Sequence, residues 1–216
     1  MNIKEFLNRV SLIKNRCEEA AGISGENFNV FNILNLTSDE LSHSRIIAML
    51  LNPKGDHGMG SLFLRRFLET TNVECIGIDF SGAVVEREKP IEGGRPDIVI
   101  TTNVKEIIIE NKIYAQDQGE QLSRYSNYNK DAVLLYLILD GHPSKSAKED
   151  THYHRISYKE HILKWLEICI RESENNTFLW GTISQYVLLV KQLTGQSGGM
   201  KWTRRFWIPS RKTRTR

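Results

Sequence analysis

The sequence predicts an α/β fold, with helices at both ends of the chain and a sheet between them. Hydrophobic residues recur at helical spacing near the two ends, and the pattern changes to short strand-like runs between residues 83 and 139. The expected order is helices, then β-β-β-α-β, then helices, which is typical of one α/β domain. No convincing linker interrupts residues 1–200, so we expect a single domain there, followed by a basic tail over residues 201–216.

Three helices are expected before the sheet. The first twenty residues carry apolar side chains at helical spacing, and this amphipathic helix should end near Gly22. A second helix is expected to begin at Thr37 or Ser38 and to stop at Asn52-Pro53. A glycine-rich turn follows, and a third helix should begin at Ser61.

The sheet is expected in the middle of the chain. Three short apolar runs bounded by turn residues predict strands at residues 83–89, 96–101 and 104–112. The Thr102-Asn103 turn is short enough to join the last two as a hairpin. A helix over residues 117–129 then leads to an almost wholly apolar strand over residues 132–139, as expected at the centre of a sheet.

Two further helices should close the fold. The capping-box sequence Ser157-Tyr158-Lys159-Glu160 predicts the start of a helix that continues to about Arg171. Another helix is expected over residues 178–193.

The formal net charge of +3 comes entirely from the end of the chain. Of 29 Lys and Arg residues, seven lie in residues 201–216, which contain none of the 26 Asp and Glu residues. The first 200 residues therefore carry 22 basic and 26 acidic side chains. The tail alternates aromatic and basic residues, so it either stacks on bases and binds phosphate or is disordered.

Composition excludes several classes of protein. The longest apolar run has eight residues, whereas a membrane-spanning helix needs about 20. The N-terminus carries charges where a signal peptide is apolar. The three cysteines are widely spaced and odd in number, which indicates free thiols in a reducing compartment. We expect a cytoplasmic protein with no membrane partner.

Three charged residues form the most informative pattern in the sequence. Glu110 and Lys112 are two apart on a predicted strand, so their side chains share one face. Asp97 begins the strand expected to pair with it, and a hairpin centred on Thr102-Asn103 would place Asp97 near residue 108, diagonal to Glu110.

Two converging carboxylates beside an ammonium group suit cleavage of a phosphodiester bond. Mg²⁺ prefers oxygen ligands and is usually held by one or two carboxylates plus substrate phosphate. Such an ion promotes attack by water and neutralises charge on the phosphate. The alternative is structural: Glu110 and Lys112 would form a surface salt bridge, and Asp97 would cap the turn after Pro96.

The same residues carry a resemblance to a known family. Pro96-Asp97, followed after twelve residues by Glu110-Asn111-Lys112, resembles the motif of the PD-(D/E)xK nuclease superfamily. That resemblance implies a restriction-endonuclease-like fold, an αβββαβ core with a central mixed sheet. Gln121 to Tyr125 is similar to the Gln-xxx-Tyr element of the RecB-like branches, and Asp39 to Arg45 is similar to the N-terminal helix of a bacterial group within the superfamily.

The resemblance implies an activity and the residues that carry it. In such enzymes Asp97 and Glu110 would bind Mg²⁺, with Mn²⁺ as a possible substitute, and the backbone carbonyl of Asn111 would add a ligand. Lys112 would assist the attacking water in a one-step, in-line hydrolysis. The implied substrate is DNA, in defence against foreign DNA or in repair, and related nucleases are often homodimers.

Two residues of the second predicted helix have competing interpretations. Glu40 resembles the helix carboxylate that joins the metal site in this superfamily. It also completes a capping box that begins at Thr37, in which its side chain would bind the N–H of Thr37. His43 lies on the same helical face as Glu40. It would contact phosphate or polarise a water, or else pack between helices.

Three further residues are candidates for binding nucleic acid. Gln121 and Tyr125 are four apart and share one face of the helix after the hairpin. That face could lie at the mouth of the site. Alternatively, Gln121 is on a solvated face and Tyr125 packs in the core. Arg95, just before Pro96-Asp97, would either meet phosphate or balance the local acids.

Two functions other than cleavage stay open. The chain could be a nucleic-acid-binding module that retains the fold without cleaving, or a regulatory subunit of a larger assembly. The intact Asp97, Glu110 and Lys112 favour a nuclease.

Overall fold

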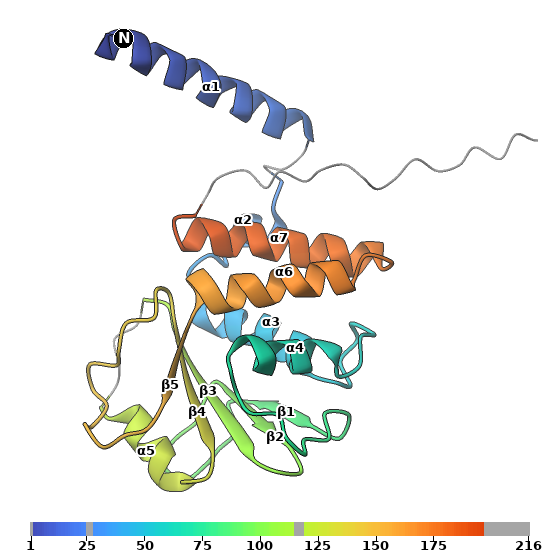
Figure 1. The fold of residues 1–216 in the computed structure, drawn as a ribbon, viewed down its shortest axis with the longest axis vertical. Coiled ribbons are helices and arrows are strands. Elements are labelled where there is room, and N and C mark those ends of the chain that lie inside the picture. Colours follow the sequence, from blue (N-terminus) through green and yellow to red (C-terminus); the bar gives the residue numbers. More distant parts are fainter. Residues whose placement is uncertain (1, 25–27, 115–118, 197–216) are drawn as a thin grey trace, which may run out of the picture.

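The computed structural model describes residues 2–24, 28–114 and 119–196. A five-stranded sheet is flanked by helices (Figure 1). The strands are β1 (Val84–Arg87), β2 (Ile98–Thr101), β3 (Glu106–Lys112), β4 (Val133–Ile138) and β5 (His154–Ser157). The helices are α1 (Ile3–Ser24), α2 (Val30–Ile33), α3 (Glu40–Leu51), α4 (Leu62–Thr70), α5 (Gln121–Tyr128), η1 (Tyr158–Ile162), α6 (Leu163–Glu172) and α7 (Thr177–Leu193). The basic tail lies outside the described residues.

The sheet is mixed, and its strands follow chain order from β1 to β5. β2 pairs antiparallel with β1 and with β3, whereas β4 pairs parallel with β3, and β5 pairs parallel with β4. This arrangement confirms the α/β class expected from the sequence. Strand β5 was not expected, because two of its four residues, His154 and Arg155, are exposed and leave no apolar run to detect.

The two faces of the sheet are covered unequally (Figure 1). Helices α3, α4 and α6 bury the larger core against one face, and α7 packs on α6. Helix α5 covers part of the other face, where Leu122 and Tyr125 pack with Ile108 of β3. We refer below to the α3 face and the α5 face of the sheet.

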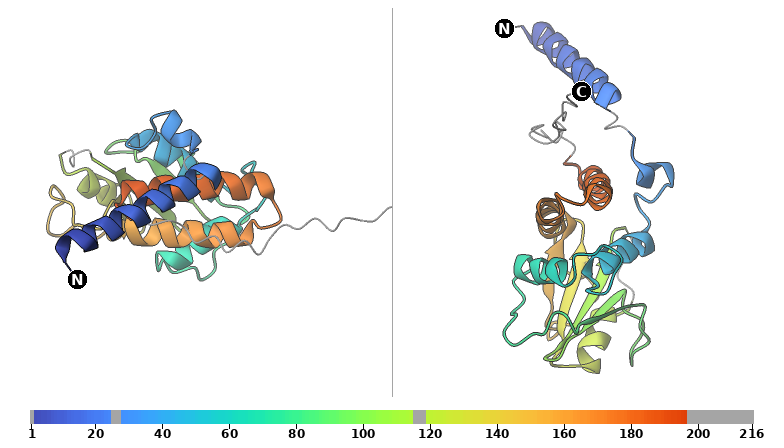
Figure 2. Two further views of the ribbon diagram at one scale, coloured as in Figure 1. Left: turned by 90° about the horizontal axis from the view of Figure 1, so that it is seen from above. Right: turned by 90° about the vertical axis from the view of Figure 1, so that its right-hand side faces the viewer.

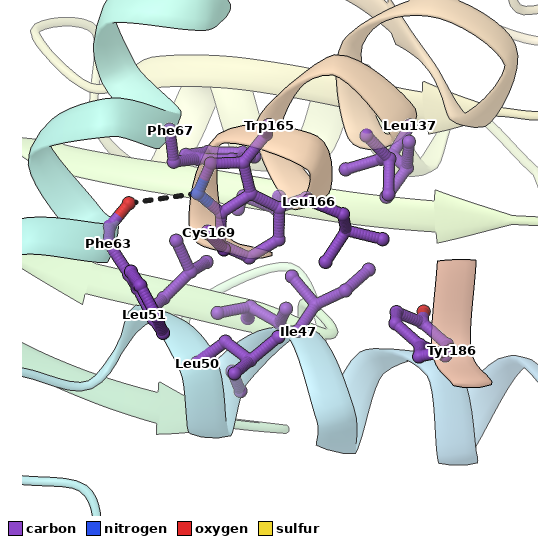
Figure 3. Packing of buried hydrophobic residues seen from close by; sticks show 14 of the residues in the cluster. Ile47, Leu50, Leu51, Phe63, Phe67, Leu137, Trp165, Leu166, Cys169 and Tyr186 are labelled. Carbon is purple, nitrogen blue, oxygen red and sulfur yellow. Dashed lines mark hydrogen bonds between the residues drawn. The ribbon is translucent and has the colours of Figure 1, made fainter. Parts of the chain in front are cut away.

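Trp165 joins two of the helices on the α3 face. Its indole N–H donates a hydrogen bond of 2.9 Å to the carbonyl of Phe63, and its ring lies edge-on to Phe67 with 5.2 Å between the centroids (Figure 3). The side chain is fully buried, so this bond satisfies the one polar group that the indole brings into the core.

Helix α1 lies apart from the helices that cover the sheet (Figure 2). It confirms the amphipathic helix expected at the N-terminus, but the apolar side chains of Ile3, Phe6 and Ile13 are 77 %, 51 % and 62 % exposed. No described helix is both long enough and apolar enough to cross a membrane.

Two helix starts differ in part from expectation. Helix α3 begins at Glu40 rather than near Thr37, because Asp39 is the N-cap and its carboxylate accepts the N–H of Leu41. At the second start the cap is confirmed, since the Ser157 hydroxyl accepts the N–H of Glu160. The first turn there, η1, is π-helical, and the α-helical part begins only at Leu163.

Candidate active site

The pairing of β2 with β3 sets the geometry of the candidate site. Ile98 lies opposite Ile109, so continuing the antiparallel register by one residue places Asp97 opposite Glu110. The expected position near residue 108 was two residues off. The turn spans Thr102 to Lys105 because the Thr102 hydroxyl accepts the N–H of Lys105 at 3.0 Å and closes a four-residue connection.

Asp97 is tied to both neighbouring strands. Its Oδ2 accepts the backbone N–H of Asn111 at 2.8 Å, and its backbone carbonyl accepts the N–H of Glu88, just after β1, at 3.2 Å. The carboxylate is therefore held against the end of β3 by a bond that fixes one of its two oxygens.

Glu110 and Lys112 form a buried ion pair on the α5 face. Lys112 Nζ lies 2.6 Å from Glu110 Oε1, and the two side chains are 12 % and 2 % exposed. The interpretation as a surface salt bridge is therefore wrong. The other oxygen of Glu110, Oε2, is buried and has no hydrogen-bond partner among the described residues.

The electrostatics of the site favour an added positive charge. Burial, together with the neighbouring charge of Asp97, raises the pKa of Glu110 to about 7 even though Lys112 opposes the shift. Burial also raises the pKa of Asp97, although the hydrogen bond from the Asn111 N–H acts to lower it. Two carboxylates thus compete for one ammonium group, and a divalent cation would relieve their repulsion.

Lys112 remains an ammonium group in this environment. Burial alone would lower its pKa, but the carboxylates of Glu110, Asp97 and Glu40 outweigh burial and raise it. Lys112 can therefore donate hydrogen bonds near the carboxylates but cannot accept a proton there at neutral pH.

Glu40 approaches the site from α3. Its Oε1 accepts the backbone N–H groups of Ile113 and Tyr114, at 2.7 and 3.0 Å, directly after the end of β3. The Glu40 side chain is thus directed to the end of β3. In a capping box it would instead bind the N–H of Thr37. Its charge is close enough to contribute to the raised pKa of Asp97.

The structure does not place His43 where nucleic acid could reach it. Its side chain is only 1 % exposed, its Nδ1 lies 2.9 Å from the hydroxyl of Tyr186, and its Nε2 lies 3.2 Å from the carbonyl of Thr37. Because a carbonyl can only accept, Nε2 carries the proton, and Nδ1 then accepts the proton of the tyrosine hydroxyl. The packing interpretation of His43 accounts for these contacts, and the phosphate contact was a wrong expectation.

The Asn111 side chain belongs to a polar network that we did not foresee. Its Nδ2 donates to the Ser44 hydroxyl at 3.0 Å and to the Glu40 carbonyl at 3.2 Å, while its Oδ1 accepts the hydroxyl of Tyr158 at 2.9 Å. The amide therefore anchors β3 to α3 on the face opposite Glu110. The partners are 47 to 71 residues away in the chain, so no local sequence signal could reveal them.

The three remaining candidates lie in different surroundings. Gln121 is half-buried, not solvated, and its amide donates to the Tyr125 hydroxyl at 2.8 Å, while its Oε1 is buried and has no partner among the described residues. Tyr125 is fully buried, in agreement with the core interpretation, and burial followed by the charge of Glu110 raises its pKa to about 12. Arg95 is exposed beside the Pro96-Asp97 pair.

The donor set fits a divalent cation that keeps much of its water. Among the described residues, no group of three or more His, Cys, Asp or Glu side chains gathers closely enough to enclose a cation. The register places Asp97 opposite Glu110, and the unpartnered Oε2 of Glu110 is available as a ligand. One or two carboxylates are the protein ligands that Mg²⁺ typically uses where substrate phosphates complete its coordination.

Comparison with known proteins agrees with this geometry. The family model described as the PD-(D/E)XK nuclease superfamily matches residues 28–188, from before α2 into α7 and across every strand of the sheet. No curated protein and no solved structure gives a significant match. The mixed sheet, with its flanking helices, is consistent with the restriction-endonuclease-like fold of that superfamily. The chain therefore belongs to the PD-(D/E)XK nuclease superfamily.

Proposed function

We propose that the protein is a Mg²⁺-dependent nuclease that hydrolyses phosphodiester bonds in DNA. One observation carries the proposal: two carboxylates, Asp97 and Glu110, lie side by side next to the Lys112 ammonium, and Oε2 of the buried Glu110 lacks a partner among the described residues. Burying like charges is costly unless a cation compensates them. A structural ion pair would need only one of the two carboxylates.

Asp97 and Glu110 are the proposed cation ligands. The backbone carbonyl of Asn111 is a third proposed ligand, and Glu40 contributes its charge from α3. When bound, Mg²⁺ would act as a Lewis acid that withdraws charge from the phosphate and lowers the pKa of water. Mn²⁺ has the same charge and accepts the same oxygen ligands, so it should substitute.

Lys112 is the proposed hydrogen-bond donor to the attacking water and the reacting phosphate. Because the neighbouring carboxylates keep it charged, it would stabilise negative charge that develops on the phosphate oxygens. Attack by water in line with the leaving oxygen then needs no covalent intermediate with the protein. Gln121 and Arg95 are proposed to contact the nucleic-acid backbone beside this centre.

The biological setting is proposed from the family alone. DNA is favoured over RNA by the nucleases of this superfamily, and defence against foreign DNA or repair in a bacterial cytoplasm would use such an activity. A homodimer would supply the two sites needed to cut both strands of a duplex.

Cleavage assays test the proposal directly. Plasmid, single-stranded DNA and RNA should be incubated with the protein in Mg²⁺, Mn²⁺ or EDTA, beside Asp97→Ala and Lys112→Ala. The exposed-site variants Asp131→Ala and Lys164→Ala serve as matched controls. We expect cleavage of DNA that requires the metal, is lost in both site variants and persists in both controls.

Two other results would redirect the interpretation. Metal-dependent cleavage that survives both site substitutions would rule out the proposed residues. Binding without cleavage of any substrate would favour a nucleic-acid-binding module, and neither binding nor cleavage would favour a regulatory subunit.

A further inference from the structure

A groove lined by basic side chains lies on the α3 face of the sheet, near the candidate active site. It has a volume of about 310 Å³ and lies between the C-terminal half of α3, the turn after that helix, and strand β1. Its charged walls are Arg45, Lys54 and Arg87 against a single acid, Asp56. Ala48 and Val85 contribute apolar surface between them.

The three cations of this basic groove outnumber the one acid that lines it. In the part of the chain that the structure describes, none of them forms an ion pair, whereas Arg66 and Lys89 each contact two carboxylates. Because the first 200 residues carry more acidic than basic side chains, three unpaired cations around one groove are a local reversal of charge. The groove therefore suits a ligand with several negative charges.

The turn that presents Lys54 is held rigidly. His57 is buried, with Nε2 bonded to the Asn52 carbonyl at 2.9 Å and Nδ1 accepting the N–H of Met59 at 3.0 Å. The backbone is so tight at Gly55 that an added Cβ would lie 2.9 Å from the Met49 carbonyl oxygen. The groove wall is thus formed before any ligand binds, which lowers the entropic cost of binding.

Two elements, α3 and β1, connect the basic groove to the candidate active site. Arg45 follows Glu40 by five residues on α3, which is a rise of about 7.5 Å. Arg87 precedes Glu88, whose N–H bonds to the Asp97 carbonyl across a strand spacing of about 4.8 Å. Both elements therefore lead from the groove to residues that contact the candidate site, Glu40 at the end of β3 and Glu88 beside Asp97.

The groove and the carboxylates face opposite sides of the sheet, and the edge strand connects them. Arg87 shares the α3 face with Val85, whereas Asp97 and Glu110 point to the α5 face. β1 is the outermost strand, so a ligand that crosses the end of β1 at Glu88 would meet both.

We propose that the basic groove binds the sugar-phosphate backbone of the nucleic-acid substrate to one side of the cleaved bond. The inference rests on the proposed nuclease function and adds Arg45, Lys54 and Arg87 as the residues that hold the flanking backbone. Contacts of this kind increase affinity for every sequence alike and position the strand for cleavage.

Equilibrium binding of a short DNA duplex in EDTA tests the groove without the complication of cleavage. The full chain should be compared with the triple variant Arg45→Ala/Lys54→Ala/Arg87→Ala over a range of salt concentrations. The control is Lys159→Ala/Lys164→Ala/Arg171→Ala, which removes the same charge from exposed sites on η1 and α6. All three proteins keep the basic tail, so its contribution is common to them.

We expect the groove variant to bind about tenfold more weakly than the wild type, with a slope of log K against log salt that is smaller by about 2.7 for three lost phosphate contacts. The control variant should keep both the affinity and the slope. Circular dichroism and thermal melting confirm that each variant is folded, and single Arg45→Lys and Arg87→Lys variants should retain most of the binding.

The results also separate this inference from the proposed function. Equal binding by the groove and control variants would overturn the inference, and metal-dependent cleavage by the wild type would still support the nuclease. If the wild type neither binds nor cleaves nucleic acid, both are overturned.

Discussion

The backbone N–H of Asn111 donates a hydrogen bond of 2.8 Å to Oδ2 of Asp97. The carboxylate proposed to bind a cation therefore also extends the pairing of β2 with β3 beyond Ile98, the first residue of β2. Since Asn111 lies between Glu110 and Lys112, this bond positions Asp97 relative to both. The Asp97 carboxylate thus has two roles, as a hydrogen-bond acceptor in the fold and as a proposed cation ligand. A suitable substitution can remove the second role and keep the first.

Asp97→Asn keeps an oxygen that accepts the N–H of Asn111 but removes the negative charge. We expect the melting temperature to be equal to or higher than that of the wild type, because the repulsion between Asp97 and Glu110 disappears. Cleavage should fall by about 10²- to 10⁴-fold, as expected when several kcal/mol of transition-state stabilisation is lost. Single-turnover cleavage and thermal melting measure the two effects, with the exposed Asp131→Asn as control. Unchanged cleavage in Asp97→Asn would contradict the assignment.

At Glu40, too, a substitution can remove the negative charge and keep the hydrogen bonds. Glu40→Gln retains an oxygen that can accept the N–H groups of Ile113 and Tyr114, so it should melt near the wild-type temperature while its cleavage decreases. Glu40→Ala leaves both groups without their acceptor and should lose about 1–3 kcal/mol of unfolding free energy as well. Thermal melting and cleavage rates of the two variants test this. If Glu40→Gln cleaves like the wild type, the role of Glu40 is structural.

Hydrophobic periodicity was sufficient to predict the part of the fold that carries the site. The apolar side chains of Ile107 and Ile109 alternate with Glu110 and Lys112 along β3, and this alternation correctly places the two charges on one face. Burial of the ion pair was harder to foresee, because it depends on α5 covering that face from a separate part of the chain.

Two details of the fold were predicted wrongly, the register of the hairpin and the start of α3. Both depend on side-chain hydrogen bonds whose partners the spacing did not indicate. The hairpin register shifted by two residues because the Thr102 hydroxyl closes a longer turn. The start of α3 moved because Asp39, not Thr37 or Ser38, caps the helix, which leaves Glu40 to bind the end of β3. Spacing along the chain shows which groups can interact locally, but it does not decide between competing partners.

Tyr158 tests how strongly the Asn111 network stabilises the fold. Tyr158→Phe removes the hydroxyl and leaves Oδ1 of the buried Asn111 without that donor. We expect a loss of about 1–3 kcal/mol in unfolding free energy, measured by urea denaturation. Tyr114→Phe is the matched control, because the Tyr114 side chain is 65 % exposed, and it should unfold like the wild type. Equal stability of the two variants would show that the network contributes little.

His43 should make the stability of the protein depend on pH. Burial lowers its pKa and outweighs the opposing effects of the Thr37 carbonyl and the charge of Asp39. Its pKa in the unfolded chain is about 6.5, so below that value the unfolded state binds more protons than the folded state. The contribution of neutral His43 to the unfolding free energy is therefore complete above about pH 6.5, and it decreases as the pH falls towards the pKa of His43 in the folded state.

His43→Gln removes this titrating group and should flatten the dependence. We expect the unfolding free energy of the wild type to fall between about pH 7 and about pH 5 more steeply than that of the variant. The variant should also be less stable at neutral pH, because it loses the ring that bonds to Tyr186 and packs against Tyr158. Urea denaturation at several pH values measures both effects. All other histidines are present in both proteins, so the difference between the two curves reports His43, and parallel curves would show that burial does not shift its titration.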